Sequence, residues 1–280
     1  MKHTPIRLVY HMYIKGFDDV VSKIHFYCLG KYINVFNEAL FIISLDDVDD
    51  TDLISSIETR ITSLGFKGNL NFKIIENDPY KREAETFYYE IVEKLDELDG
   101  ITFFAHSKGY SNKVNANLCK WITAMYFFSL DNLIIGQVKE HLLEKPSYMF
   151  DGFNPVFDDK NFETHTLWFG KTTHKWMYHG SFYWMNTQKI AKHLSNNSLQ
   201  IPKLTDRYYA ENFPGNVCPF DVKCVGFTTD YYGRYFPYWY DNASYYIKLL
   251  CGYKDSVKLK SFNEFYIKML NDLKICKDIL

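Results

Sequence analysis

The sequence of 280 residues lacks the short glycine-rich motifs with which many nucleotide-dependent enzymes hold phosphate. It contains no G-x-x-x-x-G-K-[ST] loop and no G-x-G-x-x-G after an apolar run, which disfavours P-loop ATPases and NAD-binding Rossmann enzymes. It also contains no G-x-S-x-G sequence, the nucleophile elbow of α/β hydrolases. If the protein binds a nucleotide, other residues must contact the phosphates.

A surplus of one charge and long apolar runs are missing as well. The formal net charge is −2, whereas a nucleic-acid-binding protein normally carries a basic surface, so we expect no nucleic-acid partner. No apolar run reaches the roughly 18 residues that a membrane helix needs, and the first residues lack the apolar core of a signal peptide. We therefore expect a soluble, cytoplasmic protein with at most peripheral membrane contact.

The six cysteines include no C-x-x-C pair, which indicates reduced thiols and neither a disulfide framework nor a zinc site. Aromatic residues, in contrast, make up 18% of the chain. Rings in this number can fill a core and still line a groove for a nucleotide or a sugar. Codon bias in the source organism explains the same composition equally well.

The first 110 residues alternate between short apolar runs and amphipathic segments. Alternation of this kind predicts an α/β fold with a mostly parallel sheet and right-handed crossovers. We predict a domain over 1–215 and a helical C-terminal extension over 216–280 that packs on it. The expected strands are 6–13, 38–45, 71–77, 101–106 and 176–186, and the expected helices lie near 18–29, 51–64, 82–98, 121–128 and 187–195.

The apolar run at 101–105 ends in a polar cluster of His106, Ser107, Lys108 and Gly109. Ligands bind at the carboxyl ends of strands in open α/β sheets. Lys108 can neutralise a diphosphate, His106 can contact a phosphate, a metal or a backbone carbonyl, and Gly109 permits close backbone approach. From the spacing alone, a solvated turn is an equally good interpretation.

Acidic residues follow the strand predicted at 38–45. Asp47 and Asp49 form a D-x-D sequence within the run Asp46–Asp50, and paired carboxylates of this kind can hold Mg²⁺ or Mn²⁺. The same residues precede a predicted helix at Thr51, where Asp favours the N-cap and the positive end of the helix dipole. We favour the capping interpretation.

Small residues precede an aromatic block in the segment HGSFYWMN at 179–186. Gly180 and Ser181 leave space beside the sheet, and Phe182 and Trp184 can form the wall of a sugar or nucleotide site; a buried strand with a bulge at Gly180 is the alternative. Further on, Glu211 can serve as a general base, although most Glu residues in such a segment are surface carboxylates without a catalytic role.

Several of these segments occur in an order that resembles one enzyme family. They are HSKG at 106–109, WITAM at 121–125, HGSFYWMN at 179–186 and R-x-x-x-E at 207–211, with EAETF at 83–87 and FDGFN at 150–154. The series is similar to the motifs of bacterial and viral glycosyltransferases that build capsule and lipopolysaccharide. The resemblance covers about residues 5 to 215.

The resemblance implies a GT-A-like, Rossmann-type fold and a nucleotide-sugar donor, with a UDP-sugar as the first expectation. It places His106, Ser107, Lys108 and Gly109 beside the donor diphosphate, where other GT-A enzymes carry a metal-binding D-x-D. Glu83 would lie near the nucleotide or the donor sugar. Because the strand end has no carboxylate, Lys108 would stabilise the leaving diphosphate.

The acceptor side is also implied by the resemblance, with a glycan or lipid-linked acceptor. Glu211 would act as the base. We also expect a divalent metal, Mn²⁺ or Mg²⁺, to assist, with Asp47, Asp49 or Asp151 as the candidate ligand. This chain has Gly-Ser where the family has Gly-Asn, and Tyr183 where the family has the first Trp. The residues expected to contact the acceptor are Gly180, Ser181, Phe182, Trp184 and Arg207.

The sequence thus predicts a glycosyltransferase that moves a sugar to a hydroxyl of a surface glycan. A non-catalytic nucleotide- or carbohydrate-binding protein on a degenerate transferase fold is the alternative, because fold alone does not fix function. A metal-dependent phosphate-ester hydrolase that uses the Asp46–Asp50 run is a third, weaker interpretation.

Overall fold

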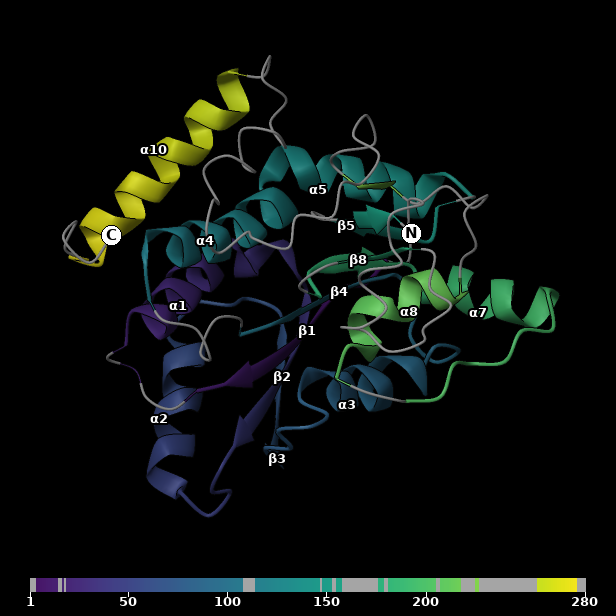
Figure 1. Ribbon diagram of the computed structural model, residues 1–280, viewed down its shortest axis with the longest axis horizontal. Coiled ribbons are helices and arrows are strands. Elements are labelled where there is room, and N and C mark those ends of the chain that lie inside the picture. The colour runs from purple at the N-terminus through teal and green to yellow at the C-terminus, as the bar shows by residue number, and fades with distance from the viewer. Residues whose placement is uncertain are drawn as a thin grey trace, which may run out of the picture.

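The computed structural model describes most of the chain and shows an α/β fold. Its main sheet has seven strands in the order β3-β2-β1-β4-β8-β5-β9, and helices cover it (Figure 1). A separate two-stranded sheet pairs β6 with β7. The described residues are 4–14, 17, 19–107, 114–146, 148–152, 155–157, 176–178, 181–204, 207–217, 225–226 and 256–275.

The main sheet is parallel except for one strand. The antiparallel strand β8 lies between β4 and β5, and the pairs β1–β2, β2–β3, β1–β4 and β5–β9 are all parallel. The predicted mostly parallel sheet is therefore confirmed. The strands are β1 (Ile6–Tyr13), β2 (Glu38–Leu45), β3 (Asn69–Glu76), β4 (Ile101–His106), β5 (Phe150–Gly152), β6 (Pro155–Phe157), β7 (Trp176–Tyr178), β8 (Tyr183–Met185) and β9 (Val225–Gly226).

The helices fill the crossovers between the strands. Those with regular α geometry are α1 (Val20–Tyr32), α2 (Thr51–Thr62), α3 (Glu83–Phe87), α4 (Ala116–Leu130), α5 (Asn132–Lys139), α7 (Thr187–Asn196), α8 (Tyr209–Val217) and α10 (Ser256–Asp272). Three further helical turns are the 3₁₀ turn η1 (Ile33–Val35) and the π turns η2 (Tyr88–Val92) and η3 (Glu140–Glu144), which continue α1, α3 and α5.

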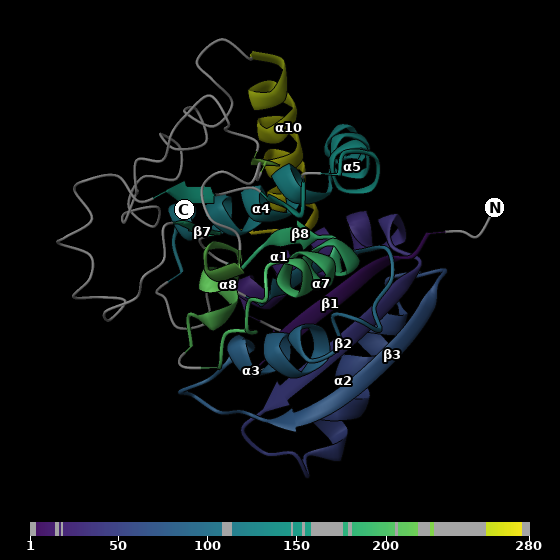
Figure 2. The same cartoon turned by 90° about the vertical axis from the view of Figure 1, so that its right-hand side faces the viewer.

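Alternate residues of the strands enter two apolar clusters, one on each face of the sheet. Leu8 and Tyr10 of β1 belong to the cluster under α1, α2, α4 and α10, whereas Val9 belongs to the cluster under α3, α7 and α8. Figure 2 shows α3, α7 and α8 together beside the strands. Because both faces are covered, the central strands read as almost unbroken apolar runs.

The acidic run before α2 caps that helix. Asp50 is the N-cap, and its side chain accepts a hydrogen bond from the Leu53 amide at 2.9 Å. Asp47 accepts a bond from the Asp49 amide at 3.0 Å, and both residues are exposed. The contact of Asp50 confirms the capping interpretation for that residue.

The strand predicted at 176–186 is wrong as a single element. The structure divides it into β7, which pairs with β6, and β8, which pairs with β4 and β5. Ser181 has a φ of +53°, a left-handed conformation through which a regular strand does not continue. The helix predicted at 82–98 is also shorter, since α3 passes into the π turn η2 and ends at Val92.

Helix α10 packs against α4 and α1, which precede it by more than 100 residues. The Phe262 ring stacks on Phe128 at 5.5 Å, and the Thr123 hydroxyl donates to the sulfur of Met269 at 3.5 Å. Helix α10 therefore completes the cluster on its face of the sheet. The domain boundary at residue 215 stays a prediction.

Within the described part of the chain, no single helix is long and apolar enough to cross a membrane. One pair passes the length and composition test only in combination, namely Ala116–Leu130 with Ile134–Glu144, and it is bent by 52°.

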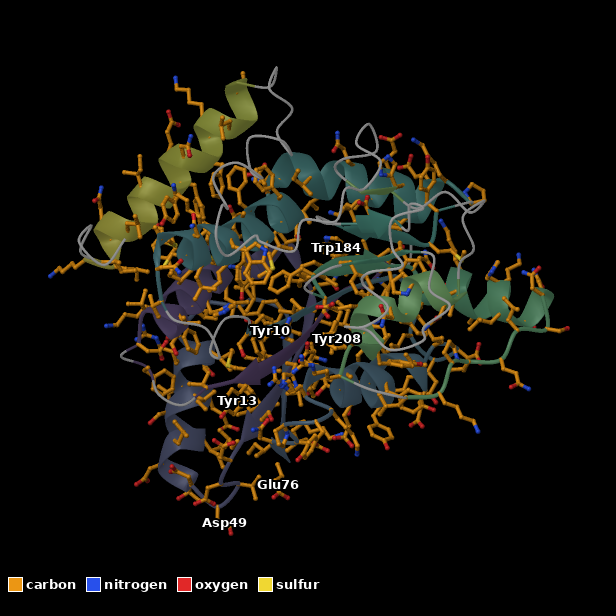
Figure 3. All side chains as sticks on the ribbon, in the orientation of Figure 1. Tyr10, Tyr13, Asp49, Glu76, Trp184 and Tyr208 are labelled. Carbon is orange, nitrogen blue, oxygen red and sulfur yellow. The ribbon has the colours of Figure 1, made fainter. Side chains whose placement is uncertain are left out.

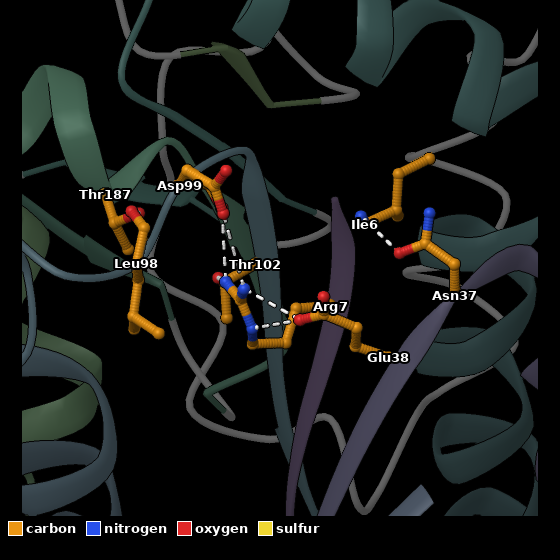
Figure 4. A network of polar contacts seen from close by, with 8 residues as sticks. All are labelled: Ile6, Arg7, Asn37, Glu38, Leu98, Asp99, Thr102 and Thr187. Carbon is orange, nitrogen blue, oxygen red and sulfur yellow. Dashed lines mark hydrogen bonds and ion pairs between the residues drawn. The ribbon is translucent and has the colours of Figure 1, made fainter. Parts of the chain in front are cut away.

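A polar network joins three strands at the amino edge of the sheet (Figure 4). The Arg7 guanidinium of β1 donates to the Glu38 carboxylate of β2 at 2.9 Å. It also donates to the Asp99 carbonyl at 3.2 Å and to the Thr102 hydroxyl of β4 at 3.4 Å. The network therefore fixes the register of β2, β1 and β4.

Gly100 precedes β4 in a conformation that other residues adopt at a cost, and Gly100→Ala should destabilise the protein. Its φ is +78°, and an added Cβ would lie 2.1 Å from the Pro5 carbonyl oxygen. We expect the free energy of unfolding to fall by about 2 kcal/mol or more, measured by urea unfolding.

Gly136→Ala is the matched control, since Gly136 lies in α5 with no atom within 4 Å of an added Cβ. There alanine should raise the free energy of unfolding by about 0.5–1 kcal/mol. Equal effects of the two substitutions would contradict the strained backbone at Gly100.

Candidate functional site

The carboxyl ends of β1 and β4 lie side by side at the point where the strand order reverses. From β1 the chain proceeds outward to β2 and β3, then returns to β4 on the other side of β1. His11 and His106 are direct register partners across this junction. Ligand crevices in open α/β sheets form at such a reversal. Tyr13 and Glu76, labelled in Figure 3, are the last residues of β1 and β3 at the same edge.

Helix α3 and the turn η2 cover a row of four register partners. The row consists of Lys73 on β3, Ile42 on β2, His11 on β1 and His106 on β4. Three polar residues of the helix contact this row: Glu83, Thr86 and Glu90, at the i, i+3 and i+7 spacing of one helix face.

Each polar residue of the row pairs with a residue of the helix. His11 Nδ1 lies 2.9 Å from the Thr86 hydroxyl, and His106 Nδ1 lies 3.7 Å from a Glu83 carboxylate oxygen. These four side chains are all buried. At the open end of the row, Lys73 forms an ion pair with Glu90 at 2.5 Å. We call His11, Glu83, Thr86 and His106 the buried polar cluster.

Burial decides the protonation of His11. It lowers the pKa of the imidazole from 6.5 to about 4, because an ion is poorly solvated in the interior. The Glu83 charge opposes this shift and the His106 charge adds to it. His11 is therefore neutral at pH 7, and the buried polar cluster contains a neutral ring beside an acidic side chain.

Ser107 joins the ends of the two strands. Its hydroxyl accepts from the Tyr13 amide at 2.7 Å and donates to the Tyr13 carbonyl at 3.0 Å. Its own amide donates to the His11 carbonyl at 2.9 Å. These bonds hold the strand end firmly in place. Lys108 and Gly109, the other half of the predicted donor motif, lie outside the described residues.

The aromatic segment borders the cluster from the other side. The Phe182 ring is 6.1 Å from the His106 ring and 5.3 Å from the Tyr126 ring. The Ser181 hydroxyl next to it is buried and has no hydrogen-bond partner. The structure therefore brings Ser181 and Phe182 to the strand end that carries His106. Gly180 lies outside the described residues.

Trp184 occupies the core. Its ring is 1% exposed and lies 4.8 Å from the Phe103 ring and 5.5 Å from the Phe36 ring, and its Nε1 donates to the Ser129 carbonyl at 3.0 Å. Figure 3 shows it among the side chains of the interior. Its contact with an acceptor stays a prediction. In this arrangement the ring packs in the apolar core under the sheet face that α1 and α4 cover.

Helix α8 carries Glu211 against the helix of the cluster. The Phe213 ring of α8 meets the Phe87 ring of α3 edge-on at 5.2 Å. Glu211 is 3% exposed, and the nearby Tyr183 has its pKa raised by burial first, then by the charges of Tyr209 and Glu211. A buried carboxylate therefore lies on the same side of the sheet as the buried polar cluster.

Arg207, at the start of the same region, is half-buried. Its guanidinium lies 4.6 Å above the centre of the Tyr208 ring and also bonds the Tyr208 hydroxyl. Tyr208 is labelled in Figure 3 near α8. The stacked guanidinium is thus held beside α8, and its predicted contact with an acceptor stays a prediction.

Asp151 on β5 pairs with a histidine. Its carboxylate lies 3.1 Å from His141 Nδ1, and the His141 ring stacks on Tyr148 at 5.1 Å. Burial raises the pKa of the Asp151 carboxyl, while the bond from His141 opposes the shift. Among the described residues, no group of three or more His, Cys, Asp or Glu side chains is arranged to hold a metal ion.

The acidic run of residues 46–50 is likewise engaged. Asp46 accepts bonds from the Tyr13 hydroxyl at 2.9 Å and from the side-chain amide of Asn77 at 2.7 Å. It joins the carboxyl ends of β1, β2 and β3. Asp50 caps α2 and Asp47 accepts from the Asp49 amide, so the described contacts of this run give the phosphate-ester hydrolase no structural support.

A cavity of about 260 Å³ lies next to the buried polar cluster, between β2, β3 and the helix. Thr86 both borders this cavity and bonds His11. Sequence reasoning missed His11, Thr86 and the cavity. Thr86 had a signal, because it lies within the motif EAETF; His11 had none, because its neighbours are 75 and 95 positions away. The lining residues are Ile42, Lys73, Ile75, Glu76, Glu85, Thr86, Tyr89 and Glu90.

His11→Gln should remove a pH dependence of stability. Between pH 6.5 and about 4, the unfolded chain binds a proton at His11 that the folded protein does not bind. In this window, each unit by which the pH is lowered should reduce the free energy of unfolding by about 1.4 kcal/mol through this residue alone. Urea unfolding at pH 7, 6 and 5 should show the wild type and the variant converging as the pH falls. Parallel curves would contradict a neutral, buried His11.

Comparison with protein-family models finds no match for this chain, and comparison with curated proteins finds none. Its function therefore has to be inferred from its own residues, above all from the buried polar cluster where β1 and β4 end together.

Proposed function

We propose that the protein is a glycosyltransferase that moves a sugar from a nucleoside diphosphate donor to a hydroxyl of a surface glycan. The observation that supports it most is the buried polar cluster at the reversal of strand order. A crevice there suits a nucleotide, and the strand that borders it continues into the sequence HSKG. The mostly parallel sheet is compatible with the GT-A-like fold that the resemblance implies.

The proposed reaction assigns one role to each side of the crevice. The acceptor hydroxyl would give its proton to Glu211 as its oxygen bonds the anomeric carbon of the donor sugar. The bond from that carbon to the diphosphate would break, and Lys108 would stabilise the negative charge on the leaving group. His106 and Glu83 would contact the donor, and Ser181 and Phe182 would border the acceptor.

A divalent metal is not needed for this assignment. Mn²⁺ or Mg²⁺ would supply charge neutralisation at the diphosphate, but the described residues do not fit such an ion, since Asp151 is buried and bonded to His141. No step of the proposed reaction is therefore assigned to a metal. The metal dependence expected from the family stays a prediction, tested by adding Mn²⁺ or EDTA to the transfer reaction.

A non-catalytic nucleotide- or carbohydrate-binding protein is the second candidate. The observation that favours it is the arrangement of Ser107 and Trp184, whose polar atoms bond backbone groups of the fold. A binding protein would retain a nucleotide sugar without breaking it down. Turnover of the donor therefore separates the two candidates.

Lys108→Ala and Glu211→Gln should each lower kcat by about 100-fold or more, while the melting temperature stays near that of the wild type for Lys108→Ala. The measurement is release of nucleoside diphosphate from UDP-, GDP- and dTDP-sugars in the presence of glycan acceptors. Glu211→Gln should still bind the donor, because the change affects the base and leaves the diphosphate site intact.

Glu93→Gln is the matched control, because Glu93 is exposed at the end of η2 and should keep full activity. Wild-type turnover in Lys108→Ala would refute the transferase assignment. Donor binding without any turnover in the wild type would favour the binding protein.

A further inference from the structure

The cavity beside the buried polar cluster has walls suited to a flat ring. Ile42 of β2 and Ile75 of β3 line it on the sheet side, and Tyr89 of η2 lines it on the helix side. An apolar floor and an aromatic side wall favour a planar, partly apolar ligand. At about 260 Å³, the cavity is of the size of one ring system and too small for a whole nucleotide sugar.

The polar groups around this floor are mainly hydrogen-bond acceptors. Glu85 and Tyr89 stand at i and i+4 on the helix, and Glu76 and Glu90 complete the acidic lining. Ionised carboxylates only accept hydrogen bonds. A ligand that fills the cavity must therefore offer N–H or O–H donors to this side.

The carboxylates of Glu90 and Glu85 differ in the strength of their ion pairs. Glu90 is buried between Lys73 and Lys94, with contacts of 2.5 and 2.6 Å. Among the described residues, Glu85 has an exposed ion pair with Lys81 at 3.3 Å, and exposed pairs of this kind contribute little. The Glu85 carboxylate can therefore leave Lys81 and accept hydrogen bonds from a ligand. The ammonium group of Lys73 has three donors, so it can bond a ligand carbonyl while it remains paired with Glu90.

The position of the cavity agrees with a nucleoside. It lies over β2 and β3, beside the strand β1 that carries His11. Thr86 connects it with His11. A nucleoside in the cavity would thus extend its phosphates toward the ends of β1 and β4.

We propose that this cavity binds the base of the donor nucleotide and selects guanine, with Glu85 as the residue that determines specificity. The inference rests on the proposed function, since it names the nucleotide of the same site. Guanine has two adjacent donors, N1–H and the N2 amino group, which match the two oxygens of one carboxylate. Its O6 accepts from Lys73. The family resemblance gave a uracil nucleotide as the first expectation.

The other bases match these groups less well. Uracil and thymine have one N–H between two carbonyl oxygens, so each would bring an acceptor against the Glu85 carboxylate. Adenine and cytosine each have an amino group beside a ring nitrogen that is itself an acceptor. A carboxylate that meets an acceptor loses its hydrogen bonds with water and gains none, which is costly.

The test compares the affinities of GDP, UDP, ADP and CDP by isothermal titration calorimetry. For the wild type, we expect GDP to bind at least about tenfold more tightly than UDP, since a hydrogen bond to a charged group is worth this much or more. Glu85→Gln should weaken GDP binding about tenfold and leave UDP binding nearly unchanged.

Two controls separate base recognition from other effects of the substitution. Lys81→Gln breaks the same ion pair as Glu85→Gln but keeps the carboxylate, so the preference for GDP should persist. Glu97→Gln removes one exposed negative charge away from the cavity and should change neither affinity. The melting temperature of each variant is measured as well, so that a change in the preference for GDP over UDP can be distinguished from a folding defect.

The outcomes for this inference and for the transferase are distinct. Binding of UDP as tightly as GDP, or a preference for GDP that survives Glu85→Gln, would overturn the guanine site and leave the transferase open to its own test. A preference for GDP that depends on Glu85, without sugar transfer, would support the guanine site and refute the transferase. No binding of any of the four nucleotides would overturn the guanine site.

Discussion

The burial of polar side chains between α3 and the sheet is the constraint on which the candidate site depends. A buried polar group without a partner costs free energy, so each polar residue in the register row has a partner on the helix: His11 with Thr86, and His106 with Glu83. These pairs fix the position of α3 across the strands. The position of α3 in turn determines where the cavity opens and where α8 can pack.

The two faces of the sheet differ in the side chains that they bury. The face under α1, α4 and α10 is a continuous apolar core, in which Trp184 stacks between aromatic rings. The face under α3 and α8 has a smaller apolar cluster and leaves room for the buried polar cluster. Because the first face supplies most of the apolar burial, the second can accommodate polar groups at the strand ends without loss of the fold. Much of the aromatic content serves the core.

The sequence predicted the strands of the first half well and the site in part. β1, β2 and β4 have the predicted limits because their apolar runs end at polar or helix-capping residues. The strand at 176–186 was wrong because partners distant in sequence, β6 on one side and β4 and β5 on the other, divide it. Glu83 and His106 were expected in one site and do meet, whereas His11 was missed, because strand register over 95 residues leaves no mark in a single sequence.

The packing of α10 on α4 has a consequence for the synthesis of the chain. The Thr123 hydroxyl and the Met269 sulfur that meet there are 146 residues apart, so the apolar side of α4 emerges from the ribosome long before its cover. During this interval the nascent chain exposes aromatic surface of the kind that aggregates or recruits chaperones. The side of α4 that faces α10 can therefore be covered only after translation has passed α10, which makes this contact one of the last to form in the core.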